Sequence, residues 1–228
     1  AAGPLSNVQL TGTVSSPSVS ASGVTVAKLN VPLAWRDGVL SLNGTSALVN
    51  GAPVSVSGSV SPLKGQLALS VTSQGLTAKS LSAFVPGLPK IDGAADLTAK
   101  VTGSFSNPQV QLSAKSASLA LDPVSVKGFW IATDQKLSVQ DGVPSSLELA
   151  FGADRLVAAG VPIDSLTGKL NYDGQSVRFS NVQGSAGGPL SLAGSVRLSD
   201  LALDAQAELV GGDLAKITKL LAPGMVSG

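Results

Sequence analysis

Large apolar side chains occupy every second position in the segment Leu29-Asn30-Val31-Pro32-Leu33-Ala34-Trp35, and the sequence Arg36-Asp37-Gly38 follows it directly. Apolar residues then return with the same period as Leu40 and Leu42. A period of two is typical of a strand with one buried face, and Asp-Gly between two such runs is a hairpin signal. The segment therefore predicts two antiparallel strands that place Leu, Val and Trp on one face.

The chain contains this segment in a second copy. Residues 23–93 align with residues 160–228 at an offset of 137, which places Leu33 on Leu170 and Trp35 on Tyr172. The offset falls to 136 through residues 57–60 and later returns to 137. A unit repeated at this length usually stacks on its neighbours, because one copy cannot bury its own apolar face. Since the second copy stops where the first continues into strands, we expect a segment of a longer repetitive chain.

The alternating pattern divides the chain into three parts. They are a first repeat unit (residues 1–102), an insertion of further alternating strands (103–159) and a second repeat unit (160–228). Asn50-Gly51 is a signal for a type I′ hairpin turn. Pro32 lacks the N–H that a central strand needs, so its strand either lies at an edge or carries a bulge. We expect roughly 15 to 18 strands in one continuous elongated domain.

Helical spacing replaces the period of two in two short segments. One helix is expected at about 78–86 and the other at about 213–222, because apolar residues recur there every three or four positions. The first apolar face consists of Leu81, Phe84, Val85 and Leu88, and the second of Leu214, Ile217 and Leu221. We expect the first face to pack against the sheet rather than on a membrane, because only Lys79 and Lys90 flank it.

Composition argues against several classes of protein. Charged residues make up 13% of the chain and hydrophobic residues 43%, whereas disordered chains are rich in charge and poor in apolar residues. The net charge is +1 without a cluster of Lys or Arg, which argues against a nucleic-acid partner. No run approaches the ~18 apolar residues that a membrane span needs.

Catalytic patterns are missing from the sequence. The chain has neither Cys nor His, which removes most zinc sites and the commonest general base. Several aspartates stand beside turn glycines, where their ordinary role is to form the turn. The segment Ser61-Pro62-Leu63-Lys64 matches Ser-x-x-Lys by letter, but that motif works on a helix and here a proline interrupts a predicted loop. We expect no catalytic residue, metal ligand or cofactor, and no enzymatic activity.

Both copies carry a continuous stripe of aliphatic side chains. Such a stripe must be covered either by protein, as a closed core, or by another apolar group in an open groove. Alternation of apolar and polar residues occurs in both cases, so the pattern does not decide between a closed core and an open groove. An acyl chain makes no directional bonds, and an aliphatic lining without polar groups suits it. The candidate lining residues are Val31, Leu33, Trp35, Leu40, Leu42, Val54, Val56, Val60, Leu67, Leu69, Val71, Leu97, Val101, Phe105, Leu170, Tyr172, Val177, Phe179, Leu190, Leu192, Val196 and Leu198.

Two motifs resemble a known family. The phrase Gly103-Ser104-Phe105-Ser106-Asn107-Pro108 and the pattern Leu170-Asn171-Tyr172-Asp173-Gly174, followed by a Gly-Gly loop, are similar to repeats of the TamB/AsmA-like proteins. The resemblance covers nearly the whole chain, and the order of the motifs carries it. It implies an all-β, elongated antiparallel sheet folded into a U-shaped, β-taco-like groove with an apolar lining and two short embedded helices.

The same resemblance implies a function in the cell envelope of a two-membraned bacterium. The expected ligand is a phospholipid or another acyl-chain molecule, carried or shielded between the inner and outer membranes in the periplasm. A role in outer-membrane protein assembly, with an outer-membrane barrel as partner, is also implied. The inner-membrane anchor would belong to the parent chain. The alternative is a structural or adhesive β-solenoid or stalk repeat with a closed core and no ligand.

Overall fold

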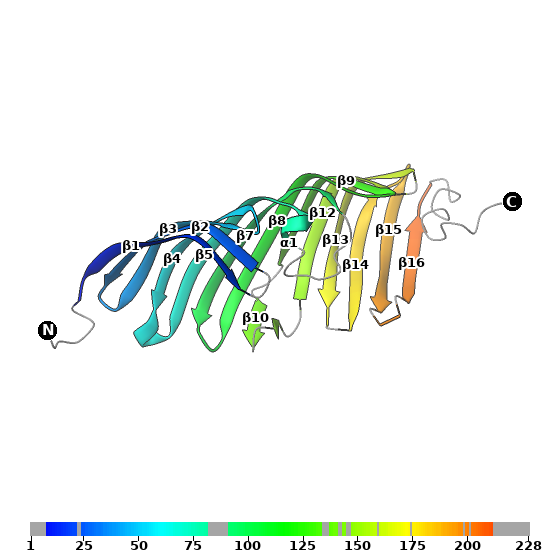
Figure 1. Cartoon of the computed structure of the whole chain (residues 1–228). Coiled ribbons are helices and arrows are strands. Elements are labelled where there is room, and N and C mark those ends of the chain that lie inside the picture. The colour runs from blue at the N-terminus through cyan, green and yellow to red at the C-terminus, as the bar shows by residue number, and fades with distance from the viewer. Residues whose placement is uncertain are drawn as a thin grey trace. The chain divides into compact units, whose positions relative to one another are not determined.

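The computed structural model describes residues 8–21, 24–81, 91–133, 137–140, 143–144, 147–158, 160–173, 175–197, 199–200 and 202–211. They form an all-β fold built on an antiparallel sheet that does not close (Figure 1). Neighbouring strands follow the order β1-β2-β3-β4-β5-β7-β8-β9-β12-β13-β14-β15-β16, so β1 and β16 are the two ends of this path. Chain order and spatial order agree along most of the path, as expected for successive hairpins.

The chain divides into two compact units, and unit 1 comprises residues 1–89, 94–114 and 136–145. Its elements are β1 (Leu10–Ala21), β2 (Val24–Arg36), β3 (Val39–Val49), β4 (Ala52–Ser61), η2 (Pro62–Lys64), β5 (Gln66–Leu76), α1 (Ala78–Leu81), β7 (Ala95–Ser104), the first part of β8 (Pro108–Leu121), β10 (Leu137–Gln140) and β11 (Val143–Pro144). Helix α1 begins where the first helix was expected. The rest of that helical face, Phe84, Val85 and Leu88, lies outside the described residues, as does the side chain of Leu81.

Unit 2 comprises residues 90–93, 115–135 and 146–228. Its elements are β6 (Asp92–Gly93), the second part of β8, β9 (Val124–Thr133), β12 (Leu147–Ala158), β13 (Val161–Tyr172), β14 (Ser176–Ser185), β15 (Pro189–Arg197) and β16 (Leu203–Leu209). The second expected helix, with Leu214, Ile217 and Leu221, lies outside the described residues.

The sequence repeat is a repeat of four strands. Strands β2 to β5 of the first copy correspond to β13 to β16 of the second, with the same antiparallel pairing. The register shifts recur as well: one lies between Leu42 and Thr45, and its counterpart lies between Phe179 and Val182. Such β-bulges bend a strand and increase its local twist. Each copy therefore repeats its bends as well as its strands.

The turns and the proline of the first copy adopt the geometry that their sequence predicts. Asn50 and Gly51 have φ of 48° and 85°, so both central residues are left-handed, as a type I′ turn requires. Pro32 does not lie at an edge, because β2 pairs with both β1 and β3. The register between β2 and β3 shifts between Asn30 and Leu33, so the strand carries the bulge that was the other expectation.

Most of the buried hydrophobic residues of the described chain lie in unit 2. Ala153, Ile163, Leu166, Val182, Ala186 and Leu190 form one buried cluster, with Phe151 and Phe179 among the residues packed against it. Ala52 is the buried hydrophobic residue of the described part of unit 1. The two units thus carry the same strand pattern but bury it to different degrees.

Candidate functional site

Cross-strand pairing places the apolar residues of unit 1 on one face. Directly opposite residues of an antiparallel pair point to the same side of the sheet. One row across β2, β3, β4 and β5 consists of Trp35, Leu40, Val60 and Leu67. The next row consists of Leu33, Leu42, Gly58, Leu69 and Val101, and a third contains Val56, Val71 and Ala99. The register thus brings the predicted lining residues of unit 1 together in successive rows, which we call the apolar face of unit 1.

This face is only half covered. Every predicted lining residue in the strands of unit 1 is intermediate in exposure, neither buried nor fully open to solvent. These residues are Val31, Leu33, Trp35, Leu40, Leu42, Val54, Val56, Val60, Leu67, Leu69, Val71, Leu97 and Val101. Large aliphatic side chains in a sealed core are usually buried completely. The described residues therefore do not seal the apolar face of unit 1.

Few polar groups interrupt the apolar face of unit 1. Thr45 lies opposite Val56, and its hydroxyl is buried without a hydrogen-bond partner among the described residues. Ser73 lies opposite Val54, but its hydroxyl donates to the Pro53 carbonyl at 2.7 Å. The Ser73 hydroxyl is already bonded and the Thr45 hydroxyl is buried, so the face offers apolar contact and little directional bonding.

Phe105 lies outside the strands. Strand β7 ends at Ser104, and Phe105 stands in the turn before β8, where its side chain is 49% exposed. Its backbone N–H donates to the Gly65 carbonyl at 2.9 Å, so it borders the turn between β4 and β5. Phe105 is therefore at the end of the apolar face rather than along it.

Unit 2 has its own apolar face. Register places Leu170 opposite Phe179, Tyr172 opposite Val177, and Val177 opposite Val196. Leu192 and Leu190 continue this face through their pairing with Ala207 and Leu209 of β16. Leu198 lies outside the described residues.

Aromatic rings fill much of the apolar face of unit 2. A Cβ atom at Gly168 would lie 2.7 Å from the Phe151 ring, and one at Gly194 would lie 2.6 Å from the Phe179 ring. Each glycine therefore leaves room for the aromatic ring of the opposite strand, a known means of covering glycine in sheets. Together with the buried cluster, these pairs close part of this face with the protein's own side chains.

Sequence reasoning missed several residues of the buried cluster in unit 2. Ile163, Leu166 and Val182 lie on either side of register shifts, where strict alternation breaks down. The shift between Asp164 and Thr167 changes which positions face the same side. The repeat is the feature that links the two bulges. The register of the first copy shifts at the equivalent place, between Ala27 and Asn30.

The opposite face of unit 2 is polar and shallowly hollowed. Arg178, Ser195 and Asp204 lie in one cross-strand row and line a depression of about 320 Å³. A neighbouring depression of about 400 Å³ also includes Asp173 and Arg197. Charges of both signs alternate there, so neither depression has the uniform potential that selects an anion or a cation.

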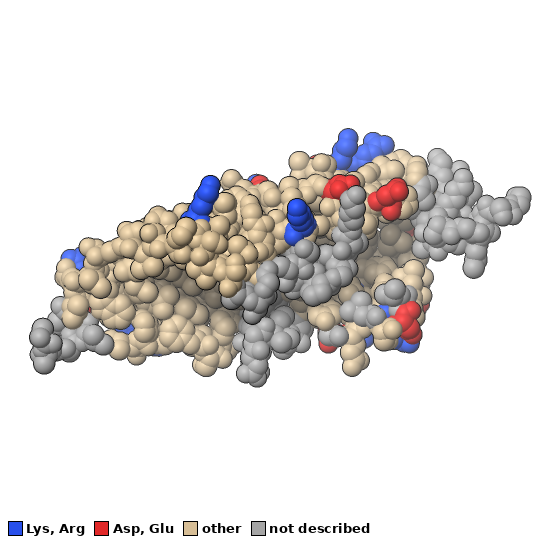
Figure 2. Space-filling view, viewed as in Figure 1, with Lys and Arg blue, Asp and Glu red and all other residues tan. Residues whose placement is uncertain are grey.

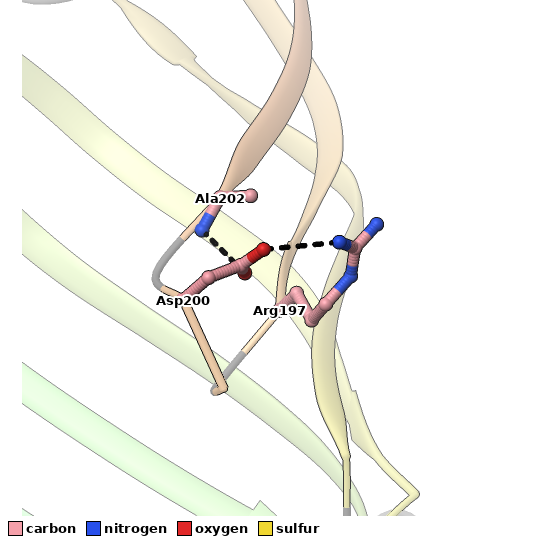
Figure 3. A network of polar contacts seen from close by, with 3 residues as sticks. All are labelled: Arg197, Asp200 and Ala202. Atoms are coloured by element: carbon pink, nitrogen blue, oxygen red, sulfur yellow. Dashed lines mark hydrogen bonds and ion pairs between the residues drawn. The ribbon is translucent and has the colours of Figure 1, made fainter.

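The hairpin turns at this end of unit 2 are held by their aspartates. Asp200 accepts hydrogen bonds from the Arg197 guanidinium at 3.0 Å and from the Ala202 backbone N–H at 3.1 Å (Figure 3). Asp173 accepts from the backbone N–H groups of Gln175 and Ser176, and these bonds lower the pKa of its carboxyl to about 2. Asp173 thus has the turn-forming role expected of aspartates beside turn glycines, and Asp200 has the same role.

Further features of the described residues limit the chemistry of the site. No group of three or more acidic, His or Cys side chains could hold a metal ion within the described ranges. None of the helices in those ranges is long and apolar enough to cross a membrane. In the view of Figure 2, most of the surface is neither acidic nor basic.

No family model, no curated protein and no solved structure matches this chain. The class of this protein is therefore described by its fold and its candidate site. It is an all-β repeat protein with an open antiparallel sheet, one side of which is apolar and, in unit 1, half covered.

Proposed function

We propose that the apolar face of unit 1 binds the acyl chains of phospholipids or similar molecules. The observation that carries the proposal is the half-buried state of its predicted lining residues, which extend over five strands, β2, β3, β4, β5 and β7. Apolar surface of this extent is costly to leave in water and marks a binding surface in soluble proteins. Each methylene group that it covers contributes about 0.8 kcal/mol.

We infer that the sheet curves into a U-shaped groove around this ligand. Bulges bend strands, and both repeat copies carry them at equivalent positions, so each repeat adds curvature of the same kind. The short helices, α1 at Ala78–Leu81 and the one expected at about 213–222, belong to the same arrangement.

The resemblance to the TamB/AsmA-like proteins supports a cellular location for this function. The protein would act in the periplasm of a two-membraned bacterium, within a parent chain anchored in the inner membrane. It would carry or shield lipid between the two membranes, or support assembly with an outer-membrane barrel. In this role it is a binding protein without a cofactor, and not an enzyme.

A matched set of variants tests lipid binding. Val56→Asp and Val71→Asp place a charge on the apolar face of unit 1, whereas Ser57→Asp and Thr72→Asp place one on the opposite face of the same strands. We expect the first pair to lose photocrosslinking to a diazirine-bearing phospholipid and the second pair to retain it. Native mass spectrometry of the wild-type protein should show co-purified phospholipid.

The controls for this experiment separate binding from folding. Far-UV circular dichroism should give the same strand signal for all four variants. Equal crosslinking by folded Val56→Asp and Ser57→Asp proteins would refute the proposal, and so would a wild-type protein that carries and captures no lipid.

A structural or adhesive repeat with a closed core is the second candidate. The buried cluster of unit 2 favours it, because Ile163 and Leu190 are each 4% exposed and are covered by the protein's own side chains. On this interpretation, Val56→Asp would unfold the protein and no lipid would be found with it.

A further inference from the structure

Three large hydrophobic side chains are exposed at one end of the strands of unit 1. Leu63 lies on η2 between β4 and β5 and is 62% exposed, and Phe105 in the turn between β7 and β8 is 49% exposed. Leu10 begins β1, lies opposite Trp35 near the end of β2, and is 59% exposed. We call Leu10, Leu63 and Phe105 the apolar rim.

The turns of the apolar rim are held in place by backbone contacts. The Phe105 N–H donates to the Gly65 carbonyl at 2.9 Å, and the Gly65 N–H donates to the Pro62 carbonyl at 3.2 Å. Leu63 lies over the hairpin turn of β2 and β3, where a Cβ at Gly38 would be 3.1 Å from its Cδ1 atom. Leu63 and Phe105 are therefore presented on hydrogen-bonded turns at the ends of the strands.

The fold does not require an exposed leucine at this turn. The repeat aligns Leu63 and Lys64 with Ser199 and Asp200, which occupy the same turn between β15 and β16. In the second copy Ser199 and Asp200 are exposed, and Asp200 accepts hydrogen bonds from the Arg197 side chain and the Ala202 N–H. Because polar residues stand at these two positions in the second copy, the chain can turn here without Leu63 or Lys64.

Charge identifies the kind of surface that the apolar rim fits. Among the described residues, unit 1 carries five basic and two acidic side chains, whereas unit 2 carries six basic and nine acidic ones. Those of unit 1 are Lys28, Arg36, Lys64, Lys79, Lys100, Asp37 and Asp96. Lys64 stands on the same turn as Leu63, and Arg36 ends β2 beside Asp37, the acidic residue of the neighbouring turn. Apolar tips beside cations are the pattern of segments that enter the interface of anionic membranes.

We propose that the apolar rim of unit 1 inserts into the surface of an anionic lipid bilayer. Leu63 and Phe105 enter the boundary between headgroups and acyl chains, and Lys64 and Arg36 contact lipid phosphates. A bilayer surface accommodates exposed apolar side chains of any shape, whereas a protein partner would need a surface that matches them. The inference is independent of lipid carriage on the apolar face, since the rim could dock on a membrane without extracting lipid from it.

Flotation with vesicles tests this proposal. The wild-type protein should float with vesicles of phosphatidylcholine and phosphatidylglycerol, and much less with phosphatidylcholine alone. The double variant Leu63→Ser with Phe105→Ser should bind the anionic vesicles about tenfold more weakly, because it loses apolar insertion. Lys64→Glu should weaken binding and reduce its sensitivity to salt.

A matched control removes equally exposed hydrophobic residues elsewhere. Leu203 and Val210 of unit 2 are 56% and 58% exposed, so Leu203→Ser with Val210→Ser should float as the wild type does. Val71→Asp should also float, which separates membrane docking from acyl-chain binding on the apolar face. Wild-type flotation by the rim variant would overturn the proposal. A dimer in size-exclusion chromatography that the rim variant dissociates, without vesicle binding by either protein, would show a protein interface instead.

Discussion

Lys28 and Ser165 are 137 positions apart in the chain, and both adopt the same left-handed backbone, with φ of 51° and 53°. Each lies at the first register shift of its repeat copy, between Ala27 and Asn30 or between Asp164 and Thr167. A non-glycine residue in this conformation costs roughly 1–2 kcal/mol. Its recurrence in residues as different as Lys and Ser indicates that the bulge belongs to the repeat and does not depend on the side chain.

Substitution of Lys28 or Ser165 by valine should destabilise the protein by about 1–2 kcal/mol, because a β-branched side chain tolerates the left-handed region poorly. Glycine at the same positions should be tolerated. Urea unfolding measures both effects, and Ser55→Val, on an extended and exposed strand position, is the control. Equal stability of the valine and glycine variants would show that the bulge relaxes without cost.

Gly58 and Gly194 should not tolerate alanine. A Cβ at Gly58 would collide with the Ala68 carbonyl oxygen and lie 2.9 Å from the Leu69 Cα, and one at Gly194 would lie 2.8 Å from the Ala205 Cα. We expect each alanine variant to lose about 1–3 kcal/mol of unfolding free energy, as overpacked sites do.

The control for these glycines is Gly12, where no atom lies within 4 Å of an added Cβ. Gly12→Ala should leave the thermal midpoint unchanged or raise it slightly. If Gly58→Ala and Gly12→Ala melt at the same temperature, the close approach of β4 and β5 is not a constraint.

Asn50 should stabilise one end of unit 1 through its side chain. Its amide oxygen accepts from the Thr25 N–H at 2.9 Å, and its amide nitrogen donates to the Ser80 carbonyl in α1 at 3.4 Å. Asn50→Gly keeps the left-handed turn and removes both bonds, so we expect a loss of about 1 kcal/mol in urea unfolding.

Asn50→Asp separates the contributions of the two hydrogen bonds to stability, since the carboxylate can still accept from the Thr25 N–H but cannot donate to the Ser80 carbonyl. Its stability should fall between those of the wild type and Asn50→Gly. A glycine variant as stable as the wild type would mean that turn conformation alone holds these segments.

Asp173 should titrate with a pKa of about 2, below its ordinary value of 3.8, because the Gln175 and Ser176 N–H groups and the Ser176 hydroxyl donate to its carboxylate. A carboxyl whose pKa is lower in the folded state stabilises fully above its unfolded pKa. The contribution is then lost as the pH falls through the folded pKa. The turn should therefore weaken between pH 3.8 and about 2.

Carbon-detected NMR of the Asp173 carboxyl measures this pKa directly. Ser176→Ala removes one donor and should raise the pKa towards 3.8, and Asp173→Asn should abolish the local pH response. An unshifted titration in the wild-type protein would contradict the bonding at this turn.

Much of the strand pattern could be predicted from the residues alone. The period of two through Leu33 and Trp35, together with turn pairs such as Asn50-Gly51, predicts hairpins that the described residues contain. Phe105 continues the alternation of Leu97 and Val101 by spacing, yet β7 ends before it. Alternation does not show where a strand stops, because a turn residue can satisfy the same period.

The sequence by itself determined which side chains share a face within each regular stretch of strand, because the two-residue period and the hairpin turns are local properties of the backbone. At the bulges, as between Asp164 and Thr167, the register of the sheet decided it. Only the tertiary structure decided how far that face is covered. Val56 and Val71 remain half-buried in unit 1, while Val182 and Leu190 are buried in unit 2. Coverage depends on residues brought together across bulged strands, such as the Phe179 ring over Gly194, and no local pattern specifies that contact.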